Sequence, residues 1–384
     1  MLRSRLFEEP ASLGPHLQDW DALAVQAGRP YCAPGWMLAW WRAAAPAGAR
    51  LRVAVALDES GRLVGVAPFW AQRRTGVEWL RLLAAPISQP TAPMAEPGRE
   101  RDCARVLAGA LAAAVPAPAV LGFDGVPAGS PWPALLADEW PGRRTARLHL
   151  EQTISAPTVS LRASGLDEWL AGKSSNFRGQ VRRLRRQLEG RGGEFHRIGP
   201  DGDMQSVLRD LARLHHSRWD PRGGSAALDD RVEAMLGMAA RELAPAGRLW
   251  VSAIIADGQT ISAHLIVAAG DELAYWLGGH DDAWAGQKPG LLALVAAIGE
   301  GLQRGGGSLA LGPGAQDYKL RLADASQALD FVTLALPGPN ALRNRAALAF
   351  YRARRALIRR LTDEQRARVR TVWGRLHRAR QGRF

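Results

Sequence analysis

Lysine, cysteine and long apolar segments are scarce in this sequence. Only three of its 50 Lys and Arg residues are lysines, namely Lys173, Lys288 and Lys319. The two cysteines, Cys32 and Cys103, are far apart and have no His pair nearby, which argues against a disulfide framework and a metal site. We therefore expect two buried thiols in a reducing compartment, and no bound metal.

No segment has the features of a signal peptide or a membrane span. Residues 1–10 (MLRSRLFEEP) lack an apolar core, and the longest apolar window, 106–121, is interrupted by Pro116 and Pro118. We expect a cytoplasmic protein that could also bind peripherally at the inner face of the membrane.

Acidic residues are almost absent from the end of the chain. Residues 341–384 contain fourteen Arg and only two acids, Asp363 and Glu364, so nearly all of the net charge of +13 lies there. The basicity belongs to a tail and not to the whole protein. The 384 residues, of which 47% are hydrophobic, suffice for two globular domains that each bury a core.

The order of predicted elements occurs twice, about 198 residues apart. The first copy has three antiparallel strands, a helix and a buried strand, at 51–58, 63–70, 77–83, 101–115 and 119–123. The second copy has three strands and a helix, at 249–255, 260–268, 272–277 and 291–304, followed by a short strand. We predict domains at 1–155 and 156–338, each with α/β structure and a mixed, mainly antiparallel sheet, and a basic helical tail at 339–384.

A candidate anion site lies within residues 275–319. Gln287, Lys288, Pro289 and Gly290 precede an apolar helix that begins at Leu291. The first amides of a helix have no internal partner, and the helix dipole is positive there, so this turn is suited to a pyrophosphate. Pro289 removes one donor, and Lys288 could supply charge in compensation.

An arginine-rich helix is predicted after Lys173. Ser175 or Asn176 could cap it, and an apolar stripe with five arginines around it follows. A solvated face and an anion-binding face are both consistent with this pattern. Under the second interpretation, Lys173, Asn176, Arg178 and Arg182 are candidate substrate ligands.

The tail predicts two amphipathic, basic helices. The first would bury Leu342, Ala346, Phe350, Leu357 and Leu361, and the second begins with a capping box at Thr362. These helices could pack on the body of the protein. They could also bind an anionic membrane surface, RNA or an acidic carrier protein.

Several of these segments together resemble a known family. The sequence is similar to GNAT-type acetyltransferases of the BioF2-like group in five segments. These are the Trp-rich N-terminus, the run from Lys173 to Gly190, the strand end at 275–280, the Lys288-Pro289-Gly290 step and the closing Tyr318-Lys319. This group includes the CelD/BcsL-type proteins of cellulose and exopolysaccharide formation. The resemblance covers most of residues 1–337.

The resemblance implies tandem GNAT domains, with acetyl-CoA or another acyl-CoA as co-substrate in the second. It places the acyl-CoA where the strand before the phosphate loop splays from its neighbour, with backbone amides of Leu277, Gly278 and Gly279 near the carbonyl. Tyr318 would protonate the departing sulfur, and Lys319 would lower its pKa or bind the acceptor. The implied activity is N-acylation of an amino sugar or small metabolite, in polysaccharide or envelope metabolism.

Acyl transfer to an amine also needs a base. His280 follows the strand directly and titrates near neutrality, with Asp281 and Asp282 beside it, although the same residues are ordinary in turns. His264 has the position of a core histidine, and we assign no role to the pair His215-His216.

Two alternatives remain open. A Fem-like aminoacyl-tRNA-dependent transferase would also use paired GNAT domains and would give the tail an RNA partner, but that family usually has a long helical hairpin, which this sequence lacks. A non-catalytic scaffold that docks on a membrane or a synthase is favoured by the single glycine of the phosphate loop.

Overall fold

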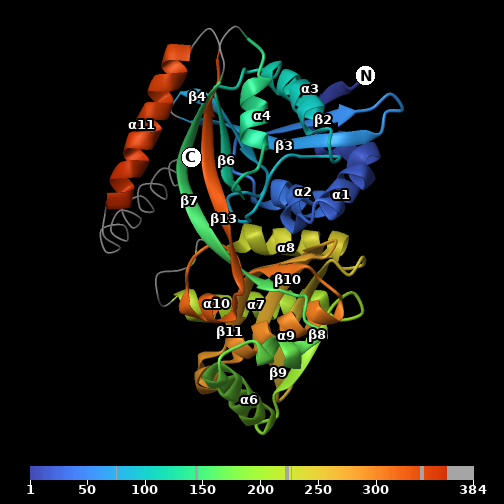
Figure 1. The fold of residues 1–384 in the computed structure, drawn as a ribbon, viewed down its shortest axis with the longest axis vertical. Helices are drawn as coiled ribbons and strands as arrows, with labels where there is room; N and C mark the ends of the chain where they lie inside the picture. Colours follow the sequence, from blue (N-terminus) through green and yellow to red (C-terminus); the bar gives the residue numbers. More distant parts are fainter. Residues whose placement is uncertain (75, 143–145, 221–224, 226, 338–340, 361–384) are drawn as a thin grey trace, which may run out of the picture.

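The computed structural model describes residues 1–74, 76–142, 146–220, 225, 227–337 and 341–360 (Figure 1). The N-terminal half comprises β1 (Arg3–Phe7), η1 (Pro10–His16), α1 (Leu17–Gln26), η2 (Pro30–Cys32), α2 (Pro34–Ala44), β2 (Arg50–Leu57), β3 (Leu63–Arg74), β4 (Val77–Leu82), β5 (Met94–Ala95), α3 (Glu100–Ala112), β6 (Val120–Pro127), α4 (Trp132–Asp138) and β7 (Arg147–Ser160).

The C-terminal half comprises α5 (Leu166–Ala171), α6 (Ser175–Glu189), β8 (Glu194–Ile198), α7 (Met204–Trp219), α8 (Asp230–Leu243), β9 (Leu249–Ala256), β10 (Gln259–Ala269), β11 (Glu272–His280), η4 (Asp282–Gln287), α9 (Pro289–Gln303), β12 (Ser308–Ala310), α10 (Asp317–Leu322), β13 (Ala325–Ala335) and α11 (Ala341–Arg360). None of the helices in the described part of the chain combines the length and apolarity that a bilayer span needs.

The predicted repeat of elements is confirmed. The β2–β3–β4 meander is followed by α3 and by β6, which pairs parallel to β4, and the β9–β10–β11 meander is followed by α9 and by β12, which pairs parallel to β11. The remaining strand pairs are antiparallel, so the sheet is mixed and mainly antiparallel, as expected.

The two halves form one 13-stranded sheet in the order β1-β2-β3-β4-β6-β13-β7-β12-β11-β10-β9-β8, with β5 paired to β3 outside this order. The long strands β7 and β13 run together through the middle, where β13 also pairs with β6 and β7 with β12 (Figure 1). The predicted boundary between residues 155 and 156 lies inside β7, and the domain limits stay a prediction.

A helical layer between the halves carries the central hydrophobic core. Helices α1 and α2 of the N-terminal half meet α7 and α8 of the C-terminal half there (Figure 1). The Trp-rich N-terminal segment contributes to this core, with Trp36 and Trp40 almost fully buried. Trp276 of β11 joins the halves directly, because its ring meets Trp36 edge-on at 5.8 Å and its indole N–H donates to Ile87 O at 3.0 Å.

The other faces of the sheet have separate cores. Helices α3 and α4 cover the N-terminal half, and α5, α6 and α9 cover the C-terminal half. The arginine-rich helix α6 has the predicted buried stripe of Val181, Leu184 and Leu188. Its cap differs from the prediction, because Ser174, and not Ser175 or Asn176, accepts the hydrogen bond from the Phe177 amide.

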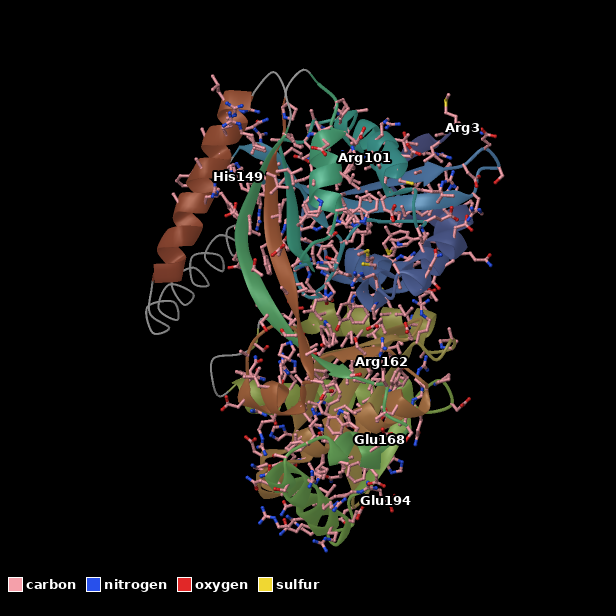
Figure 2. All side chains as sticks on the ribbon, in the orientation of Figure 1. Arg3, Arg101, His149, Arg162, Glu168 and Glu194 are labelled. Atoms are coloured by element: carbon pink, nitrogen blue, oxygen red, sulfur yellow. The ribbon has the colours of Figure 1, made fainter. Side chains whose placement is uncertain are left out.

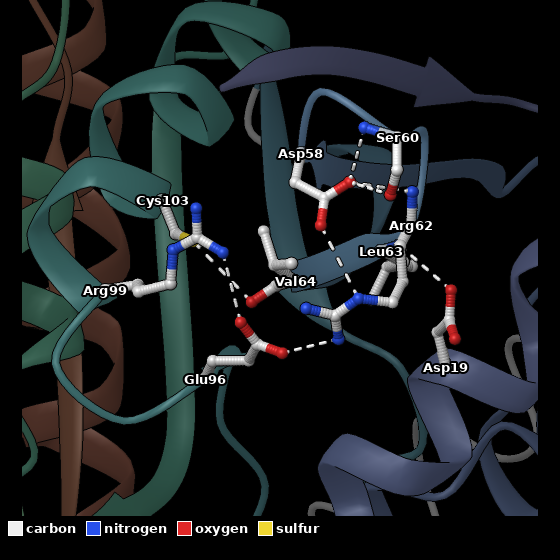
Figure 3. Close-up of polar contacts among 9 residues, drawn as sticks. All are labelled: Asp19, Asp58, Ser60, Arg62, Leu63, Val64, Glu96, Arg99 and Cys103. Atoms are coloured by element: carbon white, nitrogen blue, oxygen red, sulfur yellow. Dashed lines mark hydrogen bonds and ion pairs between the residues drawn. The ribbon is translucent and has the colours of Figure 1, made fainter. Parts of the chain in front are cut away.

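A polar network holds the β2–β3 hairpin against its surroundings (Figure 3). Asp58 accepts from the backbone N–H groups of Ser60 and Arg62, and Asp19 of α1 accepts from the Leu63 amide. Glu96 pairs with both Arg62 and Arg99 at the start of α3. These bonds tie the hairpin to two helices, which gives the N-terminal half a rigid frame.

Both cysteines are buried and free, as the sequence predicts. Burial raises the pKa of the Cys32 thiol to about 11 and that of Cys103 to about 12, so both are protonated at neutral pH. The Cys103 thiol lies 3.7 Å from the Val64 carbonyl oxygen beside the hairpin (Figure 3).

Helix α11 packs on the sheet with a different face from the one predicted. It buries Asn344, Ala347 and Leu348, whereas Leu342 and Phe350, which were predicted to be buried, are 81% and 62% exposed. Arg352 explains part of this choice of face, because it contacts His149 and Glu151 of β7. Figure 2 labels His149 on the side of β7 that faces α11.

The remaining predictions for the tail fall outside the described part. They concern the burial of Leu357 and Leu361 and the second helix from Thr362.

We predict that Trp276→Ala lowers the free energy of unfolding by about 2–4 kcal/mol, because it removes an aromatic contact and a hydrogen bond between the halves. Denaturant titration followed by circular dichroism measures this. Trp219→Ala, at an indole that is 41% exposed, is the matched control and should cost less than about 1 kcal/mol. Equal losses in the two variants would contradict the assigned role of Trp276.

Candidate active site at the parting of two strands

Strands β11 and β12 separate after three residue pairs. They pair in parallel from Glu272–Ser308 to Ala274–Ala310, after which β11 continues to His280 without a partner on that side. A register shift in the β10–β11 ladder leaves Trp276 as an extra residue, and such a bulge bends a strand away from its course. The result is a gap in the sheet with one edge made by residues 275–280.

The backbone of β11 turns hydrogen-bond donors toward this gap. The Asp281 N–H donates to Ile261 O of β10 at 2.9 Å, and N–H groups alternate in direction along a strand. The N–H groups of Gly278 and His280 therefore face the gap, while those of Leu277 and Gly279 face β10. Of the three predicted backbone donors, Gly278 is the one directed into the gap.

Gly278 and Gly279 are closely packed on opposite faces of β11. The His264 ring lies over Gly278, and Leu214 and the His215 backbone lie over Gly279. A Cβ at Gly278 would lie 2.5 Å from His264 Nδ1, and a Cβ at Gly279 would lie 2.8 Å from Leu214 Cβ and 2.9 Å from the His215 amide nitrogen of α7. Both glycines are required by this close approach, independently of their φ angles. The sequence analysis assigned no role to His215, so it did not predict this contact.

His264 is a buried neutral imidazole. It is 4% exposed, and burial together with the nearby His280 lowers its pKa to about 3. Its ring packs on Tyr275 with centroids 5.2 Å apart, and neither ring nitrogen has a hydrogen-bond partner within the described ranges. The expectation of a core position is confirmed, but the position adjoins the gap.

His280, the predicted base, lies at the end of β11. Arg218 Nη1 of α7 is 3.0 Å from both ring nitrogens, and Gly290 at the start of α9 packs against the ring. Burial, and then the Arg218 charge, lowers the pKa of His280, so the ring is neutral and able to accept a proton at neutral pH. Asp281 serves the turn, because its carboxylate accepts from the Ala283 amide at 2.9 Å and caps η4.

Tyr318 and Tyr275 meet across the gap. The side chains of Tyr275 and Tyr318 share a hydrogen bond. Burial raises the pKa of both phenols, so both are protonated at neutral pH. Tyr318 is 38% exposed and therefore accessible at the rim.

Lys319 holds the loop that precedes α10. Its Nζ donates to Gly312 O at 3.3 Å and to Pro313 O at 3.1 Å, and its side chain is buried. Burial lowers its pKa to about 8. These contacts position the loop between β12 and Tyr318.

The predicted phosphate loop has a cationic neighbour that the sequence did not reveal. Lys288 adopts a left-handed conformation (φ 49°) and precedes Pro289, and its carbonyl accepts from the amides of Leu291 and Leu292. Arg191, from the turn after α6, donates to Gln287 Oε1 at 2.9 Å and stacks on Trp284 at 4.0 Å.

Arg191 and Lys288 thus bring two positive charges to the N-terminus of α9. Arg191 lies 97 residues before Lys288 in the sequence, so no local motif could indicate their proximity.

The Lys173 segment supports the helix that carries Tyr318. Lys173 Nζ donates to Leu322 O at 2.6 Å, pairs with Asp324 and lies over the Trp169 ring at 4.7 Å. Arg178 donates to Ala171 O at 3.0 Å and Lys173 O at 2.6 Å.

The other two predicted substrate ligands, Asn176 and Arg182, are exposed on α6. Of the four, therefore, Lys173 and Arg178 are engaged inside the chain, and a substrate role for the set stays a prediction. Within the described ranges, no group of three or more His, Cys, Asp or Glu side chains could hold a metal ion.

Comparison with known proteins agrees with this geometry. Residues 175–320 match the model of the acetyltransferase (GNAT) domain family. Among curated proteins, none matches the chain in sequence.

Solved structures show the same fold at low identity. FemX is 11% identical with a TM-score of 0.61, covering 84% of this chain and 96% of its own. The C-terminal domain (DUF2156) of a protein assigned as a lysylphosphatidylglycerol synthetase from Agrobacterium fabrum is 12% identical with a TM-score of 0.56, covering 90% and 96%. The enzyme L-PGS from Bacillus licheniformis is 11% identical with a TM-score of 0.51, covering 88% and 95%.

We predict that Gly278→Ala lowers the free energy of unfolding by about 1–3 kcal/mol, because the new methyl group collides with His264. Adding His264→Ala should recover part of this loss, with a coupling on the order of 1 kcal/mol in a double-mutant cycle. Gly286→Ala, where a Cβ meets nothing within 4 Å, is the control. Additive effects of the two changes would refute the close contact.

Proposed function

Because residues 175–320 match a GNAT domain, we propose that this chain transfers an acyl group from acyl-CoA to an amine. The observation that carries the proposal is the parting of β11 from β12 after Ala274, beside the N-terminus of α9 and the Tyr318 hydroxyl. An elongated thioester could pair with the free edge of β11, with its phosphates near Arg191, Lys288 and the Gly290 amide at the start of α9.

The reaction divides among three groups of the chain. As the amine nitrogen bonds to the thioester carbonyl carbon, the Gly278 N–H stabilises the oxygen, and neutral His280 takes the amine proton. The carbon–sulfur bond breaks, and Tyr318 gives its proton to the departing sulfur. The hydrogen bond with Tyr275 orients the Tyr318 hydroxyl.

A cavity between the two halves adjoins the paired part of β11 and β12, and Gly278, His280 and Tyr318 are not among its lining residues. Its volume is ≈ 380 Å³, and it reaches Ala274 and Ala310, the last residue pair before the strands part. Arg29, Glu272 and Gln327 are among its polar lining residues. We propose an amino sugar or a comparable small metabolite as the acceptor, as the resemblance to the BioF2-like group implies.

The resemblance to the BioF2-like and CelD group supports a cytoplasmic role in polysaccharide or envelope formation. The gap between β11 and β12 and the tyrosine pair beside it are compatible with that acceptor class.

A second candidate is aminoacyl transfer of the Fem type. It is favoured by the fold shared with FemX and with the lysylphosphatidylglycerol synthetases. Against it, the longest helix described between residues 156 and 337 has 16 residues, so this part contains no long helical hairpin. Mass spectrometry of ligands retained on purification would separate bound CoA species from bound tRNA.

We expect acetyl-CoA to bind the intact protein in calorimetry. Removing one cation by Arg191→Ala should weaken binding about tenfold, which corresponds to about 1.4 kcal/mol. Arg183→Ala, on the exposed side of α6, is the matched control and should leave the affinity unchanged. Folded protein that binds no acyl-CoA would refute the proposed donor.

We expect Tyr318→Phe to lower kcat by about 100-fold without changing the affinity for acetyl-CoA, because it removes only the proton donor. Thiol release from acetyl-CoA, with a panel of amino sugars and small amines, measures this. Tyr351→Phe, at a ring that stacks on Trp79 at 4.7 Å in another core, is the control. Unchanged turnover in Tyr318→Phe would point to another acid or to a non-catalytic scaffold.

A further inference from the structure

Helix α11 has two apolar faces, of which the sheet covers only one. Asn344, Ala347, Leu348 and Tyr351 recur at helical spacing and pack toward β4, where Tyr351 stacks on Trp79. Arg352 adds an ion pair with Glu151 at 3.2 Å. The helix is therefore held in one rotational orientation about its axis.

That orientation leaves the opposite face of α11 in solvent. Leu342 and Phe350 are 81% and 62% exposed and are two of the largest exposed apolar side chains in the described residues. Exposed alanines continue the same stripe, at Ala346, Ala349 and Ala353. The spacing i, i+4, i+7, i+8 and i+11 makes this a continuous strip along the helix.

Positive charge borders the strip. On a helical wheel Arg343 lies next to Phe350 at one edge of the strip, and Arg345 lies next to Ala349 at the other edge. Residues 341–384 contain fourteen Arg and only two acidic residues. An apolar strip between arginines is the pattern of a helix that lies in the interface of an anionic bilayer, with the long side chains reaching the headgroups.

We propose that the exposed face of α11 binds the surface of an anionic phospholipid membrane. The apolar strip favours this partner over RNA or an acidic carrier protein, both of which the charge alone would also attract. RNA contacts would engage the arginines and leave Leu342 and Phe350 without a role. The lipid surface uses both components, because acyl chains accept the strip and headgroups accept the arginines.

The inference does not depend on acyl transfer. Figure 1 shows α11 at the outer edge of the upper half, beside β4 and β7 and away from α10, which carries Tyr318 in the lower half. Membrane binding and catalysis can therefore fail or succeed separately in the experiments.

Co-sedimentation of the full chain with vesicles tests the proposal. Binding is expected to vesicles of phosphatidylcholine with phosphatidylglycerol, and to be at least about tenfold weaker to phosphatidylcholine alone. The double variant Leu342→Ser/Phe350→Ser should bind the anionic vesicles at least about tenfold more weakly, because it removes the apolar part of the interaction.

The matched control is Leu320→Ser, at a leucine of α10 that is 53% exposed and lies outside α11. It should bind the anionic vesicles like the unmodified chain. Circular dichroism of each variant shows whether the fold is kept, because a loss of binding counts only in folded protein.

Two results would overturn the proposal. One is vesicle binding that is equal in the double variant and the unmodified chain, which would assign the interaction to charge alone. The other is the absence of vesicle binding together with tight, salt-dependent binding of a labelled RNA, measured by fluorescence anisotropy, which would make RNA the partner.

Discussion

The parting of β11 from β12 is the constraint on which the candidate site depends. A sheet normally satisfies every N–H and C=O group of an inner strand, so a strand that loses its neighbour leaves backbone groups that need another partner. Here the bulge at Trp276 ends the pairing after Ala274, and the Gly278 N–H faces the open side. An extended ligand can replace the missing strand, and for this reason we propose the gap as the binding site.

The close packing around this gap depends on glycines and on neutral histidines. His264 can lie over Gly278 only because that residue has no side chain, and it can be buried only because it is uncharged. His280 is held neutral by partial burial and by Arg218. The same electrostatic environment that disfavours protonated histidine also favours an anionic ligand, because Arg218, Arg191 and the start of α9 are all positive.

Several lysines and arginines act on the backbone and not on a ligand. Lys173 binds the carbonyl at the end of α10, and Lys319 binds carbonyls of the loop before it, so both ends of the segment that carries Tyr318 are anchored. Two of the three lysines of this chain thus hold one catalytic candidate in position. The third, Lys288, stands at the start of α9 in a left-handed conformation.

The sequence by itself determined the local elements, because each follows from a pattern within a few residues. Alternating apolar residues and turns predicted both meanders, and the apolar run after Gly290 predicted α9, all of which the structure confirms. The resemblance in residue order predicted the GNAT fold. The sequence also located the Tyr318 and His280 segments, although their roles stay predictions.

Only the tertiary structure decided which distant residues meet. Three contacts join residues that are far apart in the chain, and no local periodicity encodes them. They are the pairing of β7 with β13, the contact of Arg218 with His280 and the contact of Arg191 with Gln287. It also decided which face of α11 is buried. The helix has apolar residues on both sides, so the periodicity allowed either choice, and the fit of Leu348 and Tyr351 against the sheet, together with the Arg352–Glu151 pair, selected one.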